Sequence, residues 1–296
     1  MTILSEYSIL EEVCKAERSL YDERAPDELQ ACLDQIESKK EDPTAKDLQA
    51  LKVLAREYFK LQSAIVSGKN GVHSFDVKTM TNKRIEMINT RLSSGQLSNG
   101  PLFDDFDPDL LNGMVYDLRV GHQAYLSSKK LPERLDSSES GMLRIEPGDF
   151  ATLITHEYVY VPPSLMAFIS VRMKYKKQGL LNVSGFHVDP SFRGRIVFTV
   201  YNAGPSDVVL QYKQPTFMMI FEKLDRAFPK RSTEYDRQTE LQPEFVAQLT
   251  GTSVSPRNLD ERLTRLEDRF SDIVLAIGVG VIVTIIAVIL GIVFKV

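Results

Sequence analysis

The stretch GFHVDPSFRGRIVFTVYN, residues 185–202, has the residue types expected in the wall of a reaction site. It predicts a turn followed by a strand, and Asp189 is its only acidic residue. Further along the strand lies Thr199, whose hydroxyl cannot take a proton unaided because its pKa is far above neutral pH. Either Asp189 serves a site, or it only opens an Asp-Pro-Ser turn, and the residues alone leave both interpretations open.

Basic side chains just before this stretch form a candidate phosphate site. Guanidinium groups bind phosphates through paired hydrogen bonds, and ammonium groups bind them as point charges. Alternate residues of a strand face opposite sides, so not all of these groups can reach one ligand. A solvated basic face is the alternative for this set, which comprises Arg172, Lys174, Lys176, Lys177 and Arg193.

Histidines and cysteines are not spaced as metal ligands. His187 and the other histidines form no cluster, and Cys14 and Cys32 have no partnering ligands nearby. We therefore predict no metal site, and two reduced thiols on helices in a cytosolic compartment. The net charge of −4 leaves no basic surplus, which argues against a nucleic-acid partner.

The elements that must position these groups are short strands. From about residue 110, runs rich in Val, Ile, Phe and Tyr alternate with Pro and Gly, which is typical of an all-β sandwich or barrel. Residues 4–67 instead repeat apolar residues at three- and four-residue steps and predict helices. We expect a mainly β protein with a helical extension over 1–75, a β domain over 80–228 and a linker over 229–256. The extension has no catalytic spacing, so we expect it either to pack or to bind a protein partner.

The end of the sequence predicts a membrane anchor. Ile273 to Phe294 is a run without charge, long enough as one helix to cross a hydrocarbon core of about 30 Å. Four arginines precede it and Lys295 alone follows it, so the positive-inside rule places the body in the cytoplasm. The first residues have no basic segment and no long apolar run, so we expect no signal peptide. We predict a single-pass, tail-anchored protein of a bacterial inner membrane, with arginines Arg257, Arg262, Arg265 and Arg269 beside the cytoplasmic face.

Residues 257–272 predict a short coiled coil before the span. Apolar residues recur in alternating steps of four and three, which is the heptad pattern. A short amphipathic helix lying on the membrane is the alternative. Within the span, Ala276 with Gly280 and Ala287 with Gly291 are spaced to let helices meet. The apolar seam consists of Leu259, Leu263, Leu266 and Phe270, and continues to Ile273.

Three ordered segments resemble the dCTP deaminase/dUTPase superfamily. Residues 85–121 end in YDLRVG, residues 144–172 contain IEPGDF and THEYVYVPPSL, and residues 178–204 contain VDPSFRG and a strand ending in YN. They are similar to the deaminase patterns YDLRLG, I-PG-F…T-E-V-LP and IDPG…G-I-LE-YN, over about residues 80–224. The resemblance implies a distorted jelly-roll β fold and homotrimers with nucleotide sites between subunits. It also implies zinc-free attack of water at the cytosine C4, with Mg²⁺ present only as part of a bound nucleoside triphosphate.

The chain departs from this resemblance at the positions to which the family assigns catalysis. Thr199 stands where the family has a glutamate that activates water. In the R-S-S-x-x-R segment Arg172 is kept, but Met173 and Lys174 replace the serines and Lys177 replaces the second arginine. The loop between Gly179 and Asp189 is also one residue shorter than the family pattern.

We therefore predict a trimer that no longer deaminates and acts as a nucleotide-sensing or scaffold module. No catalytic residue is expected, with Thr199 a degenerate position and Asp189 a remnant that the resemblance places near the deoxyribose. An active membrane-localised enzyme, either a deaminase or a dUTPase-type triphosphatase, stays open, as does a purely structural trimer. A carboxylate of Glu157 or Asp207 reaching the pocket would restore the enzyme. The candidate residues for binding a pyrimidine deoxynucleotide are Arg172, Lys174, Lys177, Asp189 and Tyr201.

Overall fold

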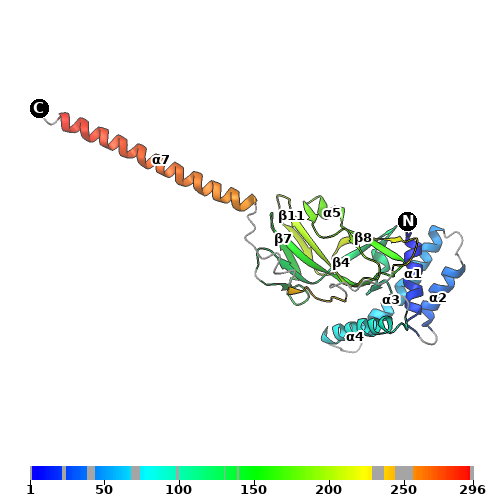
Figure 1. Ribbon diagram of the computed structural model, residues 1–296. Helices are drawn as coiled ribbons and strands as arrows, with labels where there is room; N and C mark the ends of the chain where they lie inside the picture. Colours follow the sequence, from blue (N-terminus) through cyan, green and yellow to red (C-terminus); the bar gives the residue numbers. More distant parts are fainter. Residues whose placement is uncertain are drawn as a thin grey trace. The chain divides into compact units, whose positions relative to one another are not determined.

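The computed structural model describes residues 2–21, 25–38, 44–67, 74–97, 100–129, 131–138, 140–228, 237–243 and 256–293. They fall into two compact units, residues 1–251 and residues 252–296. The first unit combines helices with an antiparallel sheet, and the second holds one long helix (Figure 1). The predicted antiparallel β domain with N-terminal helices and a long C-terminal apolar helix is confirmed.

Four helices precede most of the strands. They are α1 (Glu6–Arg18), α2 (Asp27–Ser38), α3 (Ala45–Ser67) and α4 (Ser74–Ser93). Helix α1 begins after Ser5, whose side chain accepts a hydrogen bond from the Ser8 N–H, a typical N-cap. Helices α1, α2 and α3 gather on one side of the β strands (Figure 1).

The strands form one large antiparallel sheet and one small one. The large sheet runs in the order β10-β8-β13-β4-β7-β11-β9, and the small sheet pairs β12 with β6. The long strands are β4 (Val115–Leu126), β7 (Phe150–Tyr160), β8 (Leu165–Val171), β11 (Arg193–Asn202) and β13 (Pro215–Lys223). The short strands and turns are β1 (Thr2–Ile3), β2 (Phe103–Asp104), the 3₁₀ turn η1 (Pro108–Leu110), β3 (Leu111–Asn112), β5 (Glu133–Arg134), β6 (Met142–Ile145), α5 (Met173–Lys176), β9 (Leu180–Asn182), β10 (His187–Val188) and β12 (Val208–Gln211).

Strand β4 belongs to both halves of the large sheet. Its first half pairs with β13 and its second half with β7, and the β7 pairing shifts register between Val120 and Ala124. Gly121 lies at that shift, where a Cβ would come within 2.5 Å of the Ile154 carbonyl oxygen. Only glycine fits such a close approach of two backbones, so this residue lets one strand serve two pairings.

Helices and strands of the first unit share one hydrophobic core. Leu10 and Val13 of α1 belong to the same buried cluster as Phe198 and Phe217, whose rings stack with centroids 3.8 Å apart. Buried charges also join the two parts, since Arg84 of α4 contacts Glu17 at 2.6 Å and Asp104 at 2.7 Å. The helical extension predicted over 1–75 therefore packs with the β strands as one unit, and helix continues past it to Ser93.

The two cysteines face each other between α1 and α2. Cys14 and Cys32 are both buried, free thiols. The hydrogen bond with Cys32, and then burial, raise the pKa of Cys14 well above its ordinary value. The Cys14 thiol is therefore not poised to ionise at neutral pH.

Part of the predicted linker packs on the β domain. Residues 237–243 lie beside the first half of β11, where the Arg195 N–H donates to the Gln238 carbonyl at 2.9 Å. Leu241 packs with Tyr125 and Ile154, and its N–H donates to Gln123 Oε1 at 2.8 Å. We call residues 237–241 the strap. The rest of the predicted linker, apart from Gln242, Pro243 and Pro256, lies outside the described residues.

The second unit is the helix α7, Pro256–Val293, which runs without a break through the predicted coiled coil and into the predicted span. Its stretch Arg262–Leu290 is long and apolar enough to cross a membrane, by length and composition. All of its side chains in that stretch are exposed. Phe294 and Lys295 lie outside the described residues.

Candidate functional site

A cavity of about 1260 Å³ opens beside the β10–β11 turn. Its walls come from the turn itself, from β8 and β11, from the segment after β13 and from the strap. The lining is mostly apolar, with a few polar groups, as in sites for small molecules. The polar residues of the lining that matter for the site are His187, Asp189, Ser191, Thr199, Asp225 and Gln238.

Asp189 stands on the exposed rim of this cavity. The turn is closed by the Phe192 N–H donating to the Asp189 carbonyl at 3.2 Å, and Ser191 has a φ of 67°. A proline followed by a residue with positive φ is the pattern of a type II turn. The Asp189 carboxylate contacts His187, Oδ1 to Nε2 at 3.5 Å. The turn is thus held by backbone, and the carboxylate is available to a ligand.

Thr199 lines the same cavity from β11. It pairs with Thr152 of β7, and the two hydroxyl oxygens are 3.2 Å apart. Its carbonyl accepts hydrogen bonds from the Val183 and Ser184 N–H groups, which ties the loop before β10 to the strand. The position that the resemblance assigns to a water-activating glutamate is occupied here by a hydroxyl bonded to another hydroxyl.

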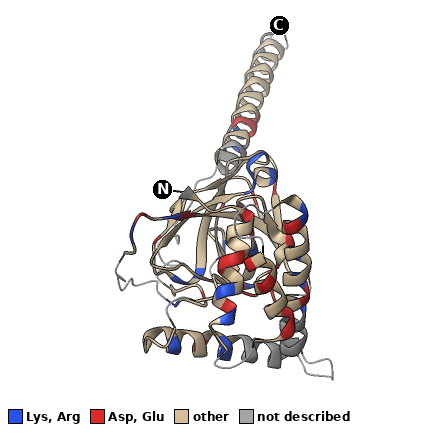
Figure 2. Ribbon diagram, turned by 90° about the vertical axis from the view of Figure 1, so that its right-hand side faces the viewer, with Lys and Arg blue, Asp and Glu red and all other residues tan. Residues whose placement is uncertain are grey.

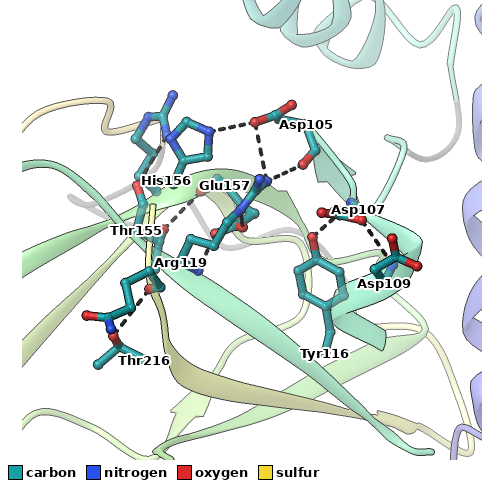
Figure 3. Close-up of polar contacts among 11 residues, drawn as sticks. Asp105, Asp107, Asp109, Tyr116, Arg119, Thr155, His156, Glu157 and Thr216 are labelled. Atoms are coloured by element: carbon teal, nitrogen blue, oxygen red, sulfur yellow. Dashed lines mark hydrogen bonds and ion pairs between the residues drawn. The ribbon is translucent and has the colours of Figure 1, made fainter. Parts of the chain in front are cut away.

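Neither of the carboxylates proposed to replace that glutamate lines the cavity. Glu157 is fully buried, and its Oε1 contacts the Arg119 Nε at 2.6 Å while its Oε2 accepts the Arg119 N–H at 2.9 Å (Figure 3). Burial raises the pKa of Glu157, and the Arg119 guanidinium opposes that shift. Asp207 instead pairs with Arg144 beside the small sheet. The carboxylates that line the cavity, among the described residues, are Asp189 and Asp225.

The Glu157 pair is part of a larger group that we call the charge cluster, comprising Arg119, Glu157, Asp105 and His156. The Arg119 Nη2 donates to the Asp105 carbonyl at 2.6 Å, and His156 Nε2 lies 2.5 Å from Asp105 Oδ2 (Figure 3). Burial lowers the pKa of His156 to about 3, so the ring is neutral at pH 7 and donates to the Asp105 carboxylate. Each of the four residues has a polar contact with another member of the cluster, which is a structural arrangement.

The remaining nucleotide-binding candidates lie outside the cavity of a single chain. Arg172 is paired with Asp117, Nη2 to Oδ2 at 3.3 Å. Lys174 and Lys177 are exposed at α5, and Tyr201 packs on Phe150 with ring centroids 4.7 Å apart. One chain therefore brings together Asp189 and Thr199 only, and a role for the other candidates stays a prediction that needs a second subunit.

Sequence reasoning missed the far wall of the cavity. Gln238 is 8% exposed, and its Nε2 donates to the Arg195 carbonyl at 2.8 Å, so its place in the wall is fixed. Asp225 follows β13, and no sequence motif beside it indicates a site residue. The apolar Leu241 within an otherwise polar segment was the one signal that residues 237–241 would pack.

The described residues contain no group of three or more His, Cys, Asp or Glu side chains able to hold a metal ion. The exposed carboxylates of Asp189 and Asp225 are oxygen ligands of a kind that Mg²⁺ accepts. An ion arriving with a triphosphate would find its other ligands on the phosphates.

Comparison with known proteins shows which family the chain resembles. The chain matches the family described as dCTP deaminase-like over residues 87–224. It is 30% identical over 124 residues to the dCTP deaminase of Pyrococcus abyssi, covering 42% of this chain and 77% of that protein. The chain belongs to the dCTP deaminase-like family. It is also 30% identical over 176 residues to the dUMP-forming dCTP deaminase of Methanobrevibacter smithii, covering 53% of this chain and 90% of that protein.

Solved structures similar to this dCTP deaminase-like chain include the 2'-deoxycytidine 5'-triphosphate deaminase of Agrobacterium tumefaciens, with a TM-score of 0.35 and 12% identity over 46% of this chain and 47% of that one. The dUTPase of EIAV has a TM-score of 0.27 and 24% identity over 31% of this chain and 77% of that one. The family match extends from α4 to the end of β13, and so includes the β10–β11 turn and the charge cluster. The strap and α7 lie beyond it.

Proposed function

We propose that this chain is a membrane-anchored, cytoplasm-facing homotrimer whose cavity binds a pyrimidine deoxynucleotide without deaminating it, and which serves as a sensing or scaffold module. The observation that carries the proposal is the Thr199–Thr152 hydroxyl pair in the cavity, 3.2 Å apart. Deamination by water needs a base with a pKa near working pH, and such a base contributes about 10²–10⁴-fold in rate. A threonine hydroxyl supplies no such base.

Retention of binding is supported by what the cavity keeps. Asp189 is exposed at its rim, and apolar side chains such as Ile169 and Phe192 line its interior. An apolar cleft with a few convergent polar groups is the usual form of a small-molecule site. A nucleotide could therefore occupy the site and shift the protein between states without being consumed.

Turnover of dCTP by the full-length protein in detergent tests the catalytic half of the proposal. We expect no dUTP above the uncatalysed rate in the presence of Mg²⁺, while calorimetric titration detects binding of dCTP, dUTP or dTTP. Thr199→Glu should gain measurable deamination, and the matched Thr199→Gln should not, because an amide cannot act as the base. Deamination by the unmodified protein at an ordinary enzymatic rate would contradict the proposal, and so would the absence of any nucleotide binding.

A triphosphatase is the second candidate, and the 3.5 Å approach of His187 to Asp189 favours it. An exposed carboxylate beside an imidazole can position a water for attack on a phosphate. This candidate predicts release of pyrophosphate from dUTP, abolished by Asp189→Asn. If the unmodified chain releases none, the triphosphatase is excluded and the sensing role remains.

Self-association of the β body is supported by an exposed apolar surface near α5. Met173, Leu181, Val183 and Phe186 are each about half or more exposed, and a gathering of such side chains commonly marks a protein interface. With the trimers that the family resemblance implies, this surface would join copies and bring the basic residues Lys174 and Lys177 to a neighbour's cavity. Native mass measurement of the detergent complex should give three copies.

The N-terminal helices offer a surface for a protein partner. Helix α2 contains no basic residue, and Asp27, Asp34 and Glu37 on it are exposed. Acidic positions are seen along the helices in Figure 2. Such a face is repelled by anionic lipid headgroups and attracts a basic protein surface, so we propose a cytosolic partner with basic character.

A further inference from the structure

Helix α7 presents a row of large apolar side chains that nothing in the described chain covers. Leu259, Leu263, Leu266 and Phe270 are each half or more exposed, from 50% at Leu259 to 69% at Phe270. They precede the apolar span and alternate with charged residues, so they face water unless another surface covers them. Burying each would gain about 1.5–3 kcal/mol, which is a strong drive for a partner of matching spacing.

The same heptad spacing continues without a break beyond Ile273. In the heptad notation a–g, Leu259 and Leu266 are at d and Leu263 and Phe270 at a. Adding steps of four and three from Ile273 gives, in order, Ile277, Gly280, Thr284, Ala287 and Gly291. The helix that carries them has no interruption, so all of these positions belong to one seam.

The charges beside the seam specify the orientation of the partner. Arg262 and Arg269 are at position g, and Glu267 is at position e. In a parallel association a g residue meets the e residue of the next heptad on the neighbouring helix, which sets Arg262 against Glu267. In an antiparallel association g meets g, and the arginines would repel each other. Copies of this chain anchored in one membrane are parallel by necessity.

The side chains at the seam change in size where the apolar span begins. From Val281 to Leu290, the seam positions are Thr284 and Ala287, and every other residue is Val, Ile or Leu. In water, large apolar residues drive helix association, whereas in lipid small residues do so because they let backbones approach closely. The change from leucine to small residues along one seam suits a helix pair that starts in water and ends in lipid.

We propose that α7 is a parallel self-association helix, with one continuous seam from Leu259 to Gly291 that binds the α7 helices of other copies of this chain. The inference rests on the membrane anchoring of the proposed function, but not on its nucleotide binding. Because a straight α-helix drifts by about 20° per heptad from a 3.5-residue repeat, the associated helices wind into a left-handed supercoil. The stalk and the span thus form one interface instead of a soluble coil joined to independent anchors.

Cysteine crosslinking of the full chain in membrane vesicles tests this seam. Single variants Thr284→Cys and Ala287→Cys place a thiol on it, and the matched Ile282→Cys and Ile285→Cys place one on the opposite side of the same turns. The unmodified chain is the blank, because Cys14 and Cys32 are buried in the first unit. We expect the first two to give disulfide-linked dimers and the other two to stay at the blank level. Equal yields on both sides would overturn the proposal.

Charge exchange tests the orientation. Arg262→Glu and Glu267→Arg should each lower the yield of the Thr284→Cys crosslink about twofold, as expected for an exposed ion pair, and the double exchange should restore it. A double exchange no better than the singles would contradict the Arg262–Glu267 pairing. Two further measurements are made on the same samples. One is the amount of chain that stays in the vesicles after an alkaline wash, and the other is the binding of dCTP by titration. Loss by washing overturns both the anchor and this inference, whereas loss of dCTP binding alone leaves the seam intact.

Discussion

The cavity and the charge cluster are two regions of the first unit that differ in how their polar groups are held. The cluster keeps Arg119 and Glu157, which stand in the YDLRVG and T-H-E segments, as a buried pair with 2.6 Å between Nε and Oε1. The cavity instead has Asp189 exposed at its rim and the Thr199 hydroxyl in its wall, and neither group belongs to a buried ion pair. Removing one partner of a buried ion pair strongly destabilises the fold, whereas removing an exposed charge outside such a pair does not. The charges of the cluster therefore stabilise the fold, whereas the polar groups of the cavity are available to a ligand.

The largest effect expected from this contrast is on stability. Glu157→Gln removes the buried counter-charge of Arg119 and leaves it the more exposed Asp105 carboxylate at 3.3 Å, so the free energy of unfolding should fall by about 3 kcal/mol. The measurement is urea unfolding followed by far-ultraviolet circular dichroism, since the chain has no tryptophan to report by fluorescence. The matched control is Asp207→Asn, which removes an ion pair whose Arg144 is exposed and should cost at most about 1 kcal/mol. Equal costs for the two variants would refute the structural role of the cluster.

The next largest effect is the pH dependence of stability that His156 causes. The folded pKa of His156, about 3, lies below the ordinary value of 6.5, so between these values the unfolded chain binds a proton that the folded chain does not. The free energy of unfolding therefore falls as pH falls from 6.5 towards 3, by up to about 1.4 kcal/mol per pH unit. Asp105, Arg119 and Arg195 are the charged groups that act on the ring.

Burial also raises the pKa values of Glu17, Asp104 and Glu157, so the variant His156→Asn, which keeps a donor for Asp105, is used to isolate the effect of His156. Its stability relative to the unmodified protein should improve as pH falls from 6.5. A difference between the two proteins that does not vary with pH would show that the ring is not buried in its neutral form.

A smaller and opposite effect is expected in the cavity turn. Ser191 has a φ of 67°, in the left-handed region, and the family pattern IDPG has glycine at this place. Ser191→Gly relieves that strain and should raise the free energy of unfolding by about 0.5–1 kcal/mol. Ser191→Ala serves as the control, because it removes the hydroxyl but keeps the strain. If alanine stabilises as much as glycine, the strain explanation is wrong.

The smallest stability change is expected at Asp189, whose exposed carboxylate holds no backbone group. Asp189→Asn should change the free energy of unfolding by no more than about 0.5 kcal/mol. Calorimetric titration should nevertheless show weaker binding of dCTP. Unchanged nucleotide affinity would assign Asp189 to the turn alone and would remove it from the site.

Local patterns in the sequence predicted the elements but not their long-range pairings. Apolar periodicity was sufficient for α3 and α7, and runs of Val, Ile and Phe for β7 and β11, because each pattern follows from the geometry of one element. The contact of Glu157 with Arg119 depends on the register of β4 against β7, which local sequence does not determine. The placement of Gln238 depends on a returning segment with one apolar residue, and the Cys14–Cys32 contact on how two helices pack.

Gly121 allows β4 to pair with β13 at one end and with β7 at the other, and the helices share the core of both halves. The first unit therefore has no internal boundary at which one part could melt while the rest stays folded. Residues 1–251 should unfold in a single cooperative transition, so that reporters placed on a helix and on the cavity rim record the same midpoint. A substitution that destabilises the charge cluster would then unfold the walls of the cavity as well, although the cluster and the cavity share no residue.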